Sequence, residues 1–298
     1  MIGKLAEDYL SHLAFERRLA GLTLKHYRRD LETLEDLVGE RSLASLQHQD
    51  IRRFAAQLHG KGLSPKSLAR LLSAWRGFFE YALRTGHVKQ NPVEGVRAPK
   101  AEKRLPEVLS PDEASRLVAI EDDSDLGKRD RALFELAYSC GLRVSELVGL
   151  DQGGIDMANG EVRVTGKGSK TRIVPIGKAA LAALKEWLSV RPAQKGAELP
   201  ALFLGPRGQR LTARAVQTRI KEWAVKQGIT ADVHPHMLRH SFASHVLQSS
   251  GDLRAVQEML GHASIASTQV YTHLDFQHLA KVYDAAHPRA KKRPDKKP

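Results

Sequence analysis

The chain has 298 residues, with 47 Lys and Arg against 34 Asp and Glu, so its formal net charge is +13. A hydrophobic fraction of 42% with 27% charged residues excludes a disordered or fibrous chain, and this length allows two domains. No apolar run approaches the roughly 20 residues of a membrane span, the amino end turns acidic too early for a secretory signal, and Cys140 is the only cysteine. We therefore expect a soluble cytoplasmic protein without membrane contact.

Three or four helices are predicted in the first ninety residues, where apolar side chains recur at helical spacing. Thr23 and Asp50 are the expected caps of the second and third helices, and Ser64-Pro65 is expected to open the fourth. Residues 1–105 carry 19 basic and 12 acidic side chains. A folded cationic surface gains affinity for polyanions through counterion release, which favours nucleic acid over a membrane as the partner.

Prolines and cations interrupt the helical periodicity after residue 90 and indicate an extended connection. We therefore expect a helical amino-terminal domain over residues 1–90, a linker over 91–109 and a second domain over 110–286. The last segment, 287–298, holds six basic groups and one acid, and is expected to be a disordered, solvated tail.

The second domain is predicted to be mostly α with a small antiparallel sheet. Ser110-Pro111 is a helix start, and two alternating segments around a Gly-rich turn form a hairpin. The strands are expected at 161–165 and 171–176, and the further helices at 128–139, 144–150, 178–190, 212–227, 239–248, 253–260 and 264–271.

A histidine-rich segment, His234 to His240, allows three interpretations. His236 and His240 share a helix face if the helix begins there, which would suit a metal, but Arg239 lies between them and no carboxylate is near. Ordinary packing or capping histidines are the second possibility. The third, a role directed at phosphate, is the one that the arginines support.

Two arginines from distant segments are candidate phosphate ligands. Arg143 opens a helix after an apolar segment that should be buried, and Arg239 lies in His236-x-x-Arg239. A buried guanidinium needs an anionic partner, which Glu146, three residues on, supplies if the role is purely structural. Two guanidinium forks that converge would instead suit a phosphodiester, since each fork binds two non-bridging oxygens.

Five short motifs follow one another along the chain: Arg143 in Gly-Leu-Arg-Val-Ser-Glu, Lys167 in Gly-Lys-Gly-Ser-Lys, His236-x-x-Arg239, Leu260-Gly261-His262, and Tyr271 nine residues later. This ordered set resembles the tyrosine recombinase (phage-integrase) family, over nearly the whole chain. Within it, the chain is most similar to the XerC group of bacterial Xer recombinases. The resemblance implies an amino-terminal four-helix SAM-like core-binding domain that binds DNA and a mainly α catalytic domain. Each motif is weak alone, but the ordered set is specific, and the expected catalytic residues are Arg143, Lys167, His236, Arg239, His262 and Tyr271.

This residue set predicts a reaction that needs neither metal nor ATP. Tyr271 would attack DNA phosphorus, with Lys167 as general acid, and Glu146 would support Arg143. In isolation Tyr271 would be an ordinary half-buried tyrosine. Lys170 and Arg172 stay outside the set, because cations on a hairpin are usually solvated. The resemblance implies a 3′-phosphotyrosine intermediate.

The resemblance also implies partners. These are double-stranded DNA, a XerD-like recombinase in a heterotetramer that resolves chromosome dimers at division, and a septal DNA translocase. Alternatives are an integron- or phage-type integrase, a type IB topoisomerase-like nicking-closing enzyme, and a DNA-binding protein without catalysis. An apolar helical stripe over 276–286 would dock either on a neighbouring protomer or on its own domain.

Overall fold

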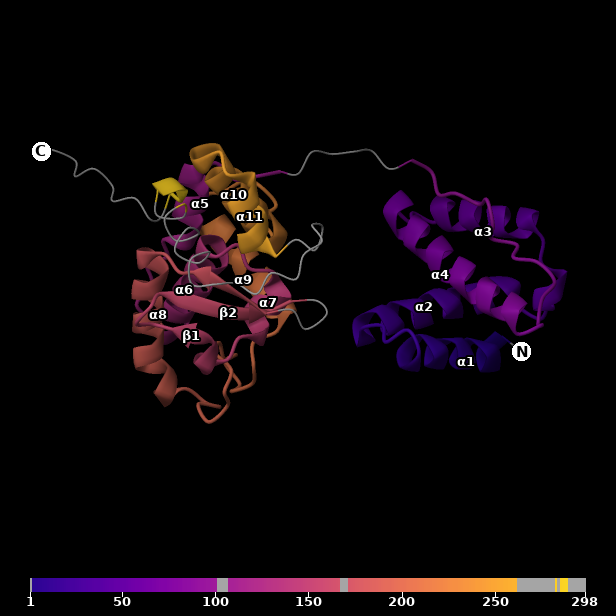
Figure 1. The fold of residues 1–298 in the computed structure, drawn as a ribbon, viewed down its shortest axis with the longest axis horizontal. Helices are drawn as coiled ribbons and strands as arrows, with labels where there is room; N and C mark the ends of the chain where they lie inside the picture. The colour runs from indigo at the N-terminus through magenta and orange to yellow at the C-terminus, as the bar shows by residue number, and fades with distance from the viewer. Residues whose placement is uncertain (1, 101–106, 167–170, 262–281, 283–284, 289–298) are drawn as a thin grey trace, which may run out of the picture. The chain divides into compact units, whose positions relative to one another are not determined.

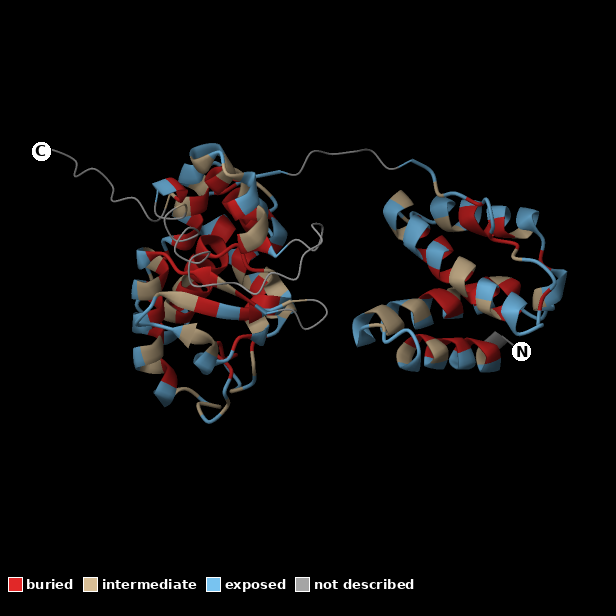
Figure 2. Cartoon of the chain, viewed as in Figure 1, coloured by how far each residue is buried: buried red, intermediate tan, exposed pale blue. Residues whose placement is uncertain are grey.

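A computed structural model describes residues 2–100, 107–166, 171–261, 282 and 285–288 of the chain, which divides into two compact units, Met1–Arg104 and Leu105–Pro298 (Figure 1). Each unit encloses its own buried core (Figure 2). No helix in the described part is long and apolar enough to cross a bilayer.

The amino-terminal unit consists of four α-helices, α1 (Ile2–Phe15), α2 (Gly21–Val38), α3 (His48–Gly60) and α4 (Pro65–Arg84), with a short 3₁₀ helix, η1 (Leu43–Ser45). Helix α4 supplies the centre of the core, because Trp75, Phe78 and Phe79 are fully buried. The indole N–H of Trp75 donates to the carbonyl of Asp30 (2.7 Å), which ties α4 to α2. The predicted helical amino-terminal domain is confirmed.

Capping in this unit follows the sequence only in part. Ser64 caps α4 as predicted, its hydroxyl accepting from the N–H of Ser67 (3.2 Å). The prediction for Thr23 is wrong, because α2 already begins at Gly21. Asp50 is not a cap either. Its carboxylate accepts from the N–H of Gln47 (3.0 Å) and so closes a capping box from the third helical position.

The segment predicted as a linker, 91–109, is packed at both ends. Val93 and Val96 are buried in the amino-terminal core, and the carbonyl of Val96 accepts from Arg76 (3.0 Å). At the other end, Leu109 is buried in the second core, and its N–H donates to the hydroxyl of Ser241 (2.9 Å). Apolar side chains at these positions bury surface that an exposed connection would leave in water.

The second unit is mainly helical with a small antiparallel sheet, as predicted, and the sheet has three strands. The sheet has the order β1-β2-β3. Helix α6 packs against α5, α8 and α10, so it is the centre of the unit (Figure 1). The elements are α5 (Pro111–Val118), α6 (Asp125–Ser139), α7 (Val144–Gly149), η2 (Gln152–Gly154), β1 (Ile155–Asp156), β2 (Glu161–Thr165), β3 (Thr171–Pro175), α8 (Lys178–Val190), η3 (Arg191–Ala193), α9 (Ala213–Lys226), α10 (Pro235–Ser250) and α11 (Leu253–Leu260).

Most predicted boundaries agree with the structure within one or two residues, and the exceptions have local causes. Helix α6 begins three residues early because Ser124 caps it. Helix α10 begins at Pro235 rather than Arg239, since the ring of His234 accepts from the N–H of Met237 (3.1 Å). The two-residue strand β1 was not predicted, and the helix expected at 264–271 lies outside the described residues.

The last described residues pack onto the second core. His287 is fully buried, with its ring 4.8 Å from that of Tyr138 and 5.5 Å from that of Phe242. Tyr138 also makes a 2.8 Å hydrogen bond with the ring Nδ1 of His245. The carboxy-terminal segment therefore packs on α6 and α10 of its own unit at residues 286 and 287, while most of the predicted stripe 276–286 lies outside the described residues.

This burial predicts an acid-sensitive stability. Burial lowers the pKa of His287 to about 3, well below its ordinary value of 6.5. Between these values the unfolded chain binds a proton that the folded chain does not, so stability falls as pH falls below about 6.5. We expect the free energy of unfolding from urea titrations to be about 1.4 kcal/mol lower at pH 5.5 than at pH 7.5 from this group alone. A His287→Gln variant should lose that part of the pH dependence, and an unchanged pH dependence would contradict the prediction.

Candidate active site

Arg143 enters the site at a sharp turn between α6 and α7. Gly141 has a positive φ of 58°, and a Cβ there would lie 2.8 Å from Cε1 of Phe242. Only glycine fits this backbone, because it combines the left-handed conformation with close contact to an aromatic ring. The turn places Arg143 at the N-cap of α7, where its side chain is about one-third exposed (35%).

Glu146 is the anionic centre of the site. It is buried, and its carboxylate accepts from the backbone N–H and from Nη1 of Arg143, both at 2.9 Å. Burial would raise its pKa, but hydrogen bonds from Arg172 and from the backbone of Arg143 outweigh it and lower the pKa to about 2. The ion pair between Arg143 and Glu146, which was the structural alternative for Arg143, is therefore present. Among the hydrogen bonds found within 107–166 and 171–261, the guanidinium group of Arg143 makes only this one, through Nη1.

Arg239 approaches the same carboxylate from α10. Its Nη1 donates to the carbonyl of Gly141 and its Nη2 to that of Leu260, both at 2.6 Å, and Nη1 lies 4.0 Å from Glu146. Burial first, and then the charge of Arg143, lowers its pKa to about 10. The group is still a cation at neutral pH. Two arginines that are almost 100 residues apart in sequence therefore meet at one carboxylate, and their convergence on a phosphodiester stays a prediction.

Arg172 was missed by the sequence analysis, and the expectation that it is solvated is wrong. It lies on β3, its side chain is 5% exposed, and its two terminal nitrogens donate to the two oxygens of Glu146 at 2.8 and 2.9 Å. Arg172 pairs with Val164 across the hairpin. This register was the available signal, because residues opposite each other share a sheet face and Val164 lies on the apolar, inward one.

His236 lies one turn before Arg239 on α10 and is exposed at the start of that helix. Its pKa is lowered by partial burial and by the charges of neighbouring histidines and of Arg239 and Arg143. Because its pKa is lowered, the imidazole of His236 is neutral at neutral pH. A neutral imidazole can accept a proton, whereas a protonated one cannot.

Three predicted catalytic residues, Lys167, His262 and Tyr271, lie outside the described residues. The described elements that lead to two of them do join the arginine cluster. Strand β3, which begins four residues after Lys167 in the sequence, carries Arg172, and α11 ends at Leu260, whose carbonyl accepts from Arg239. Strand β3 and helix α11 therefore contact the arginine cluster, while the roles of Lys167 and His262 stay predictions.

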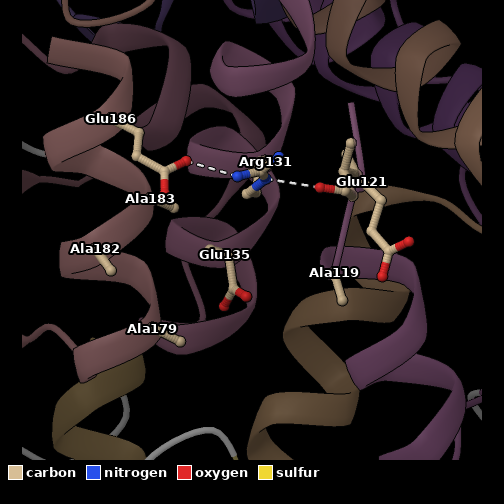
Figure 3. A pocket seen from close by; sticks show the side chains of 9 residues that line it. Ala119, Glu121, Arg131, Glu135, Ala179, Ala182, Ala183 and Glu186 are labelled. Atoms are coloured by element: carbon tan, nitrogen blue, oxygen red, sulfur yellow. Dashed lines mark hydrogen bonds and ion pairs between the residues drawn. The ribbon is translucent and has the colours of Figure 1, made fainter. Parts of the chain in front are cut away.

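A cavity in the second unit shares no lining residue with this cluster. It has a volume of about 310 Å³ and is lined by residues of α6, of α8 and of the segment 119–121 that follows α5. Figure 3 shows Arg131 bridged to Glu186 (2.6 Å), with Glu121 and Glu135 also at the wall. Because acidic side chains outnumber the one cation, this cavity does not suit a phosphate. Over the described residues no group of three or more His, Cys, Asp and Glu is placed to hold a metal.

The fold and the arginine cluster together define a class, the tyrosine recombinases, in which a helical domain precedes a mainly helical catalytic domain. The sequence profile of the phage integrase family matches residues 107–278, and that of the phage integrase N-terminal SAM-like domain matches residues 6–86. The chain belongs to the phage integrase family.

Relatives across several bacteria place the chain more closely. It is 56% identical to the tyrosine recombinase XerC 1 of Ralstonia nicotianae, covering 96% of this chain and 93% of the relative. It is 51% identical to the tyrosine recombinase XerC of Shewanella amazonensis, covering 97% of both. The chain is thus a tyrosine recombinase similar to XerC over almost its full length.

Solved structures with the same fold include proteins bound to DNA. XerH recombinase bound to a palindromic difH substrate matches with a TM-score of 0.68 at 24% identity, over 90% of this chain and 81% of that one. A lambda integrase dimer bound to a core site matches with a TM-score of 0.71 at 19% identity, and the match covers 90% of this chain and 99% of that one. These likenesses establish the fold.

Proposed function

We propose that the protein is a site-specific recombinase that exchanges DNA strands through a phosphotyrosine on Tyr271. The observation that carries the proposal is the convergence of Arg143 and Arg239 on a carboxylate that Arg172 also binds. Three guanidinium groups against one carboxylate leave a surplus of positive charge, which matches a phosphodiester and the additional charge of its transition state.

The reaction follows from this charge and from the nucleophile. The phenolic oxygen of Tyr271 attacks phosphorus, and the bond to the 5′ oxygen of the next nucleotide breaks. Lys167 protonates the departing oxygen, and His236 with His262 positions the phosphate and takes the phenolic proton. The product is still a phosphodiester, so a 5′ hydroxyl from another strand reverses the step without ATP.

DNA binding is expected to use both units, mainly through phosphates. The amino-terminal unit has a groove of about 470 Å³ between α4 and the segment 96–99, lined by Lys66, Arg76 and Arg97 without an acidic residue. Such a surface suits a polyanion.

Four protomers are needed to exchange strands between two duplexes. The XerC relatives support a heterotetramer with a XerD-like recombinase in the cytoplasm, which resolves chromosome dimers at division, with a septal DNA translocase as a further partner.

Mapping covalent protein–DNA adducts across a bacterial genome would identify the target site. A nicked duplex with that site, whose short fragment escapes after cleavage, should then trap a covalent adduct, with and without the XerD-like partner. We expect Tyr271→Phe to abolish the adduct, by at least about 1,000-fold, while DNA affinity stays within threefold, because only the nucleophilic oxygen is removed.

The controls separate the alternatives. Absence of any adduct from the unaltered protein would leave only a DNA-binding module, and adducts without products joined between duplexes would favour a type IB topoisomerase-like activity. EDTA should leave adduct formation unchanged. Loss of cleavage with EDTA would contradict the assignment of charge stabilisation to the arginines.

A further inference from the structure

The carboxylate of Glu146 is held more firmly by Arg172 than by Arg143. Arg172 makes a bidentate contact with both carboxylate oxygens of Glu146, whereas the side chain of Arg143 contacts one oxygen. Arg172 is also almost completely buried, with a side-chain exposure of 5%. Its three guanidinium nitrogens already donate to Glu146 and to the carbonyl of Met259, so Arg172 is not the main contact for a phosphate of duplex DNA.

Arg172 also connects two other parts of the site. Its Nε donates to the carbonyl of Met259 (2.8 Å), one residue before the end of α11. A Cβ on Gly261 would lie 3.0 Å from Cδ of Arg172, so the side chain passes directly beneath the carboxy-terminal cap of that helix. Through its three donors, this one residue links β3, α7 and α11.

Charge balance gives this link a chemical consequence. Without Arg172, Glu146 would be neutralised by Arg143 and Arg239, the two groups that the reaction needs for phosphate. With Arg172 in place, the buried carboxylate has its own counter-ion, so the positive charge of the other two stays available.

We infer that Arg172 is a positioning residue for strand cleavage, which fixes Glu146 and the end of α11 and keeps Arg143 available for phosphate. This inference rests on the proposed recombinase function. Lysine would not replace arginine here, because a single ammonium group cannot span both oxygens of Glu146 and the carbonyl of Met259.

The test compares Arg172→Gln and Arg172→Lys with the unaltered protein and with Arg163→Gln. Arg163 is a matched control, an exposed arginine on the neighbouring strand β2. On the trapping duplex at saturating DNA, we expect both Arg172 variants to form the covalent adduct about 100-fold more slowly, with DNA affinity changed less than threefold. Arg163→Gln should cleave at the unaltered rate. A normal rate in both Arg172 variants would overturn the inference.

Two further measurements distinguish positioning from simple loss of fold. The first is the rate of adduct formation as a function of pH. In Arg172→Gln the fall of this rate at acid pH should begin at a higher pH, because Glu146 loses the donors that keep its pKa low. In Glu146→Gln/Arg172→Gln the loss should be smaller than the product of the two single losses, since no unpaired charge remains. Strictly multiplicative losses with an unshifted profile would contradict the inference. If the unaltered protein forms no adduct, the proposed function fails instead.

Discussion

Replacing Arg239 with alanine should slow covalent adduct formation at saturating DNA by at least about 100-fold, because a charged donor to the developing phosphate charge is lost. The variant should also be less stable, by about 1–3 kcal/mol, since the carbonyls of Gly141 and Leu260 lose their buried donor. Single-turnover cleavage of the trapping duplex and urea titration measure the two effects separately.

The conservative variant sharpens this prediction. In Arg239→Lys the positive charge remains, so DNA affinity should be close to that of the unaltered protein. Cleavage should still be much slower, because one ammonium group cannot bind two carbonyls and a phosphate at once. Arg116→Gln, an exposed arginine on α5, serves as the control and should cleave normally. Cleavage by Arg239→Ala within threefold of the unaltered rate would contradict the place given to Arg239.

Gly141→Ala should damage both stability and cleavage without touching a charged group. The new methyl group would overlap the ring of Phe242, and alanine disfavours the positive φ of this turn. Together we expect a loss of at least about 2 kcal/mol in the free energy of unfolding. Cleavage should fall as well, because the Gly141 carbonyl binds Arg239 and the turn positions Arg143.

A second glycine provides the matched comparison. Gly149, at the end of α7, has no heavy atom within 4 Å of the position of a Cβ, so Gly149→Ala should be neutral or slightly stabilising. Urea titration of both variants, followed by single-turnover cleavage, gives the comparison. Equal stabilities for the two variants would show that the Gly141 turn tolerates a side chain.

Local patterns identified most of the architecture. Apolar spacing predicted α8 and α11 at their observed bounds, and Ser110 caps α5 at the predicted start, where it forms a capping box with Glu113. Helical periodicity and capping are set by residues within one or two turns of each other, so they can be predicted from sequence. The same kind of pattern, an ordered series of motifs, pointed to Arg143 and Arg239 as partners in one site.

The tertiary structure decided which charges are buried and what they contact. The sequence alone indicates that Arg172 is an ordinary solvated cation. In the structure it makes a bidentate contact with Glu146, because the strand register places its side chain on the inward face of the sheet. Likewise, Leu109 is buried against α10, and His287 against α6 and α10, which are distant from them in the chain. Contacts between distant segments depend on how whole elements pack, and no local pattern contains that information.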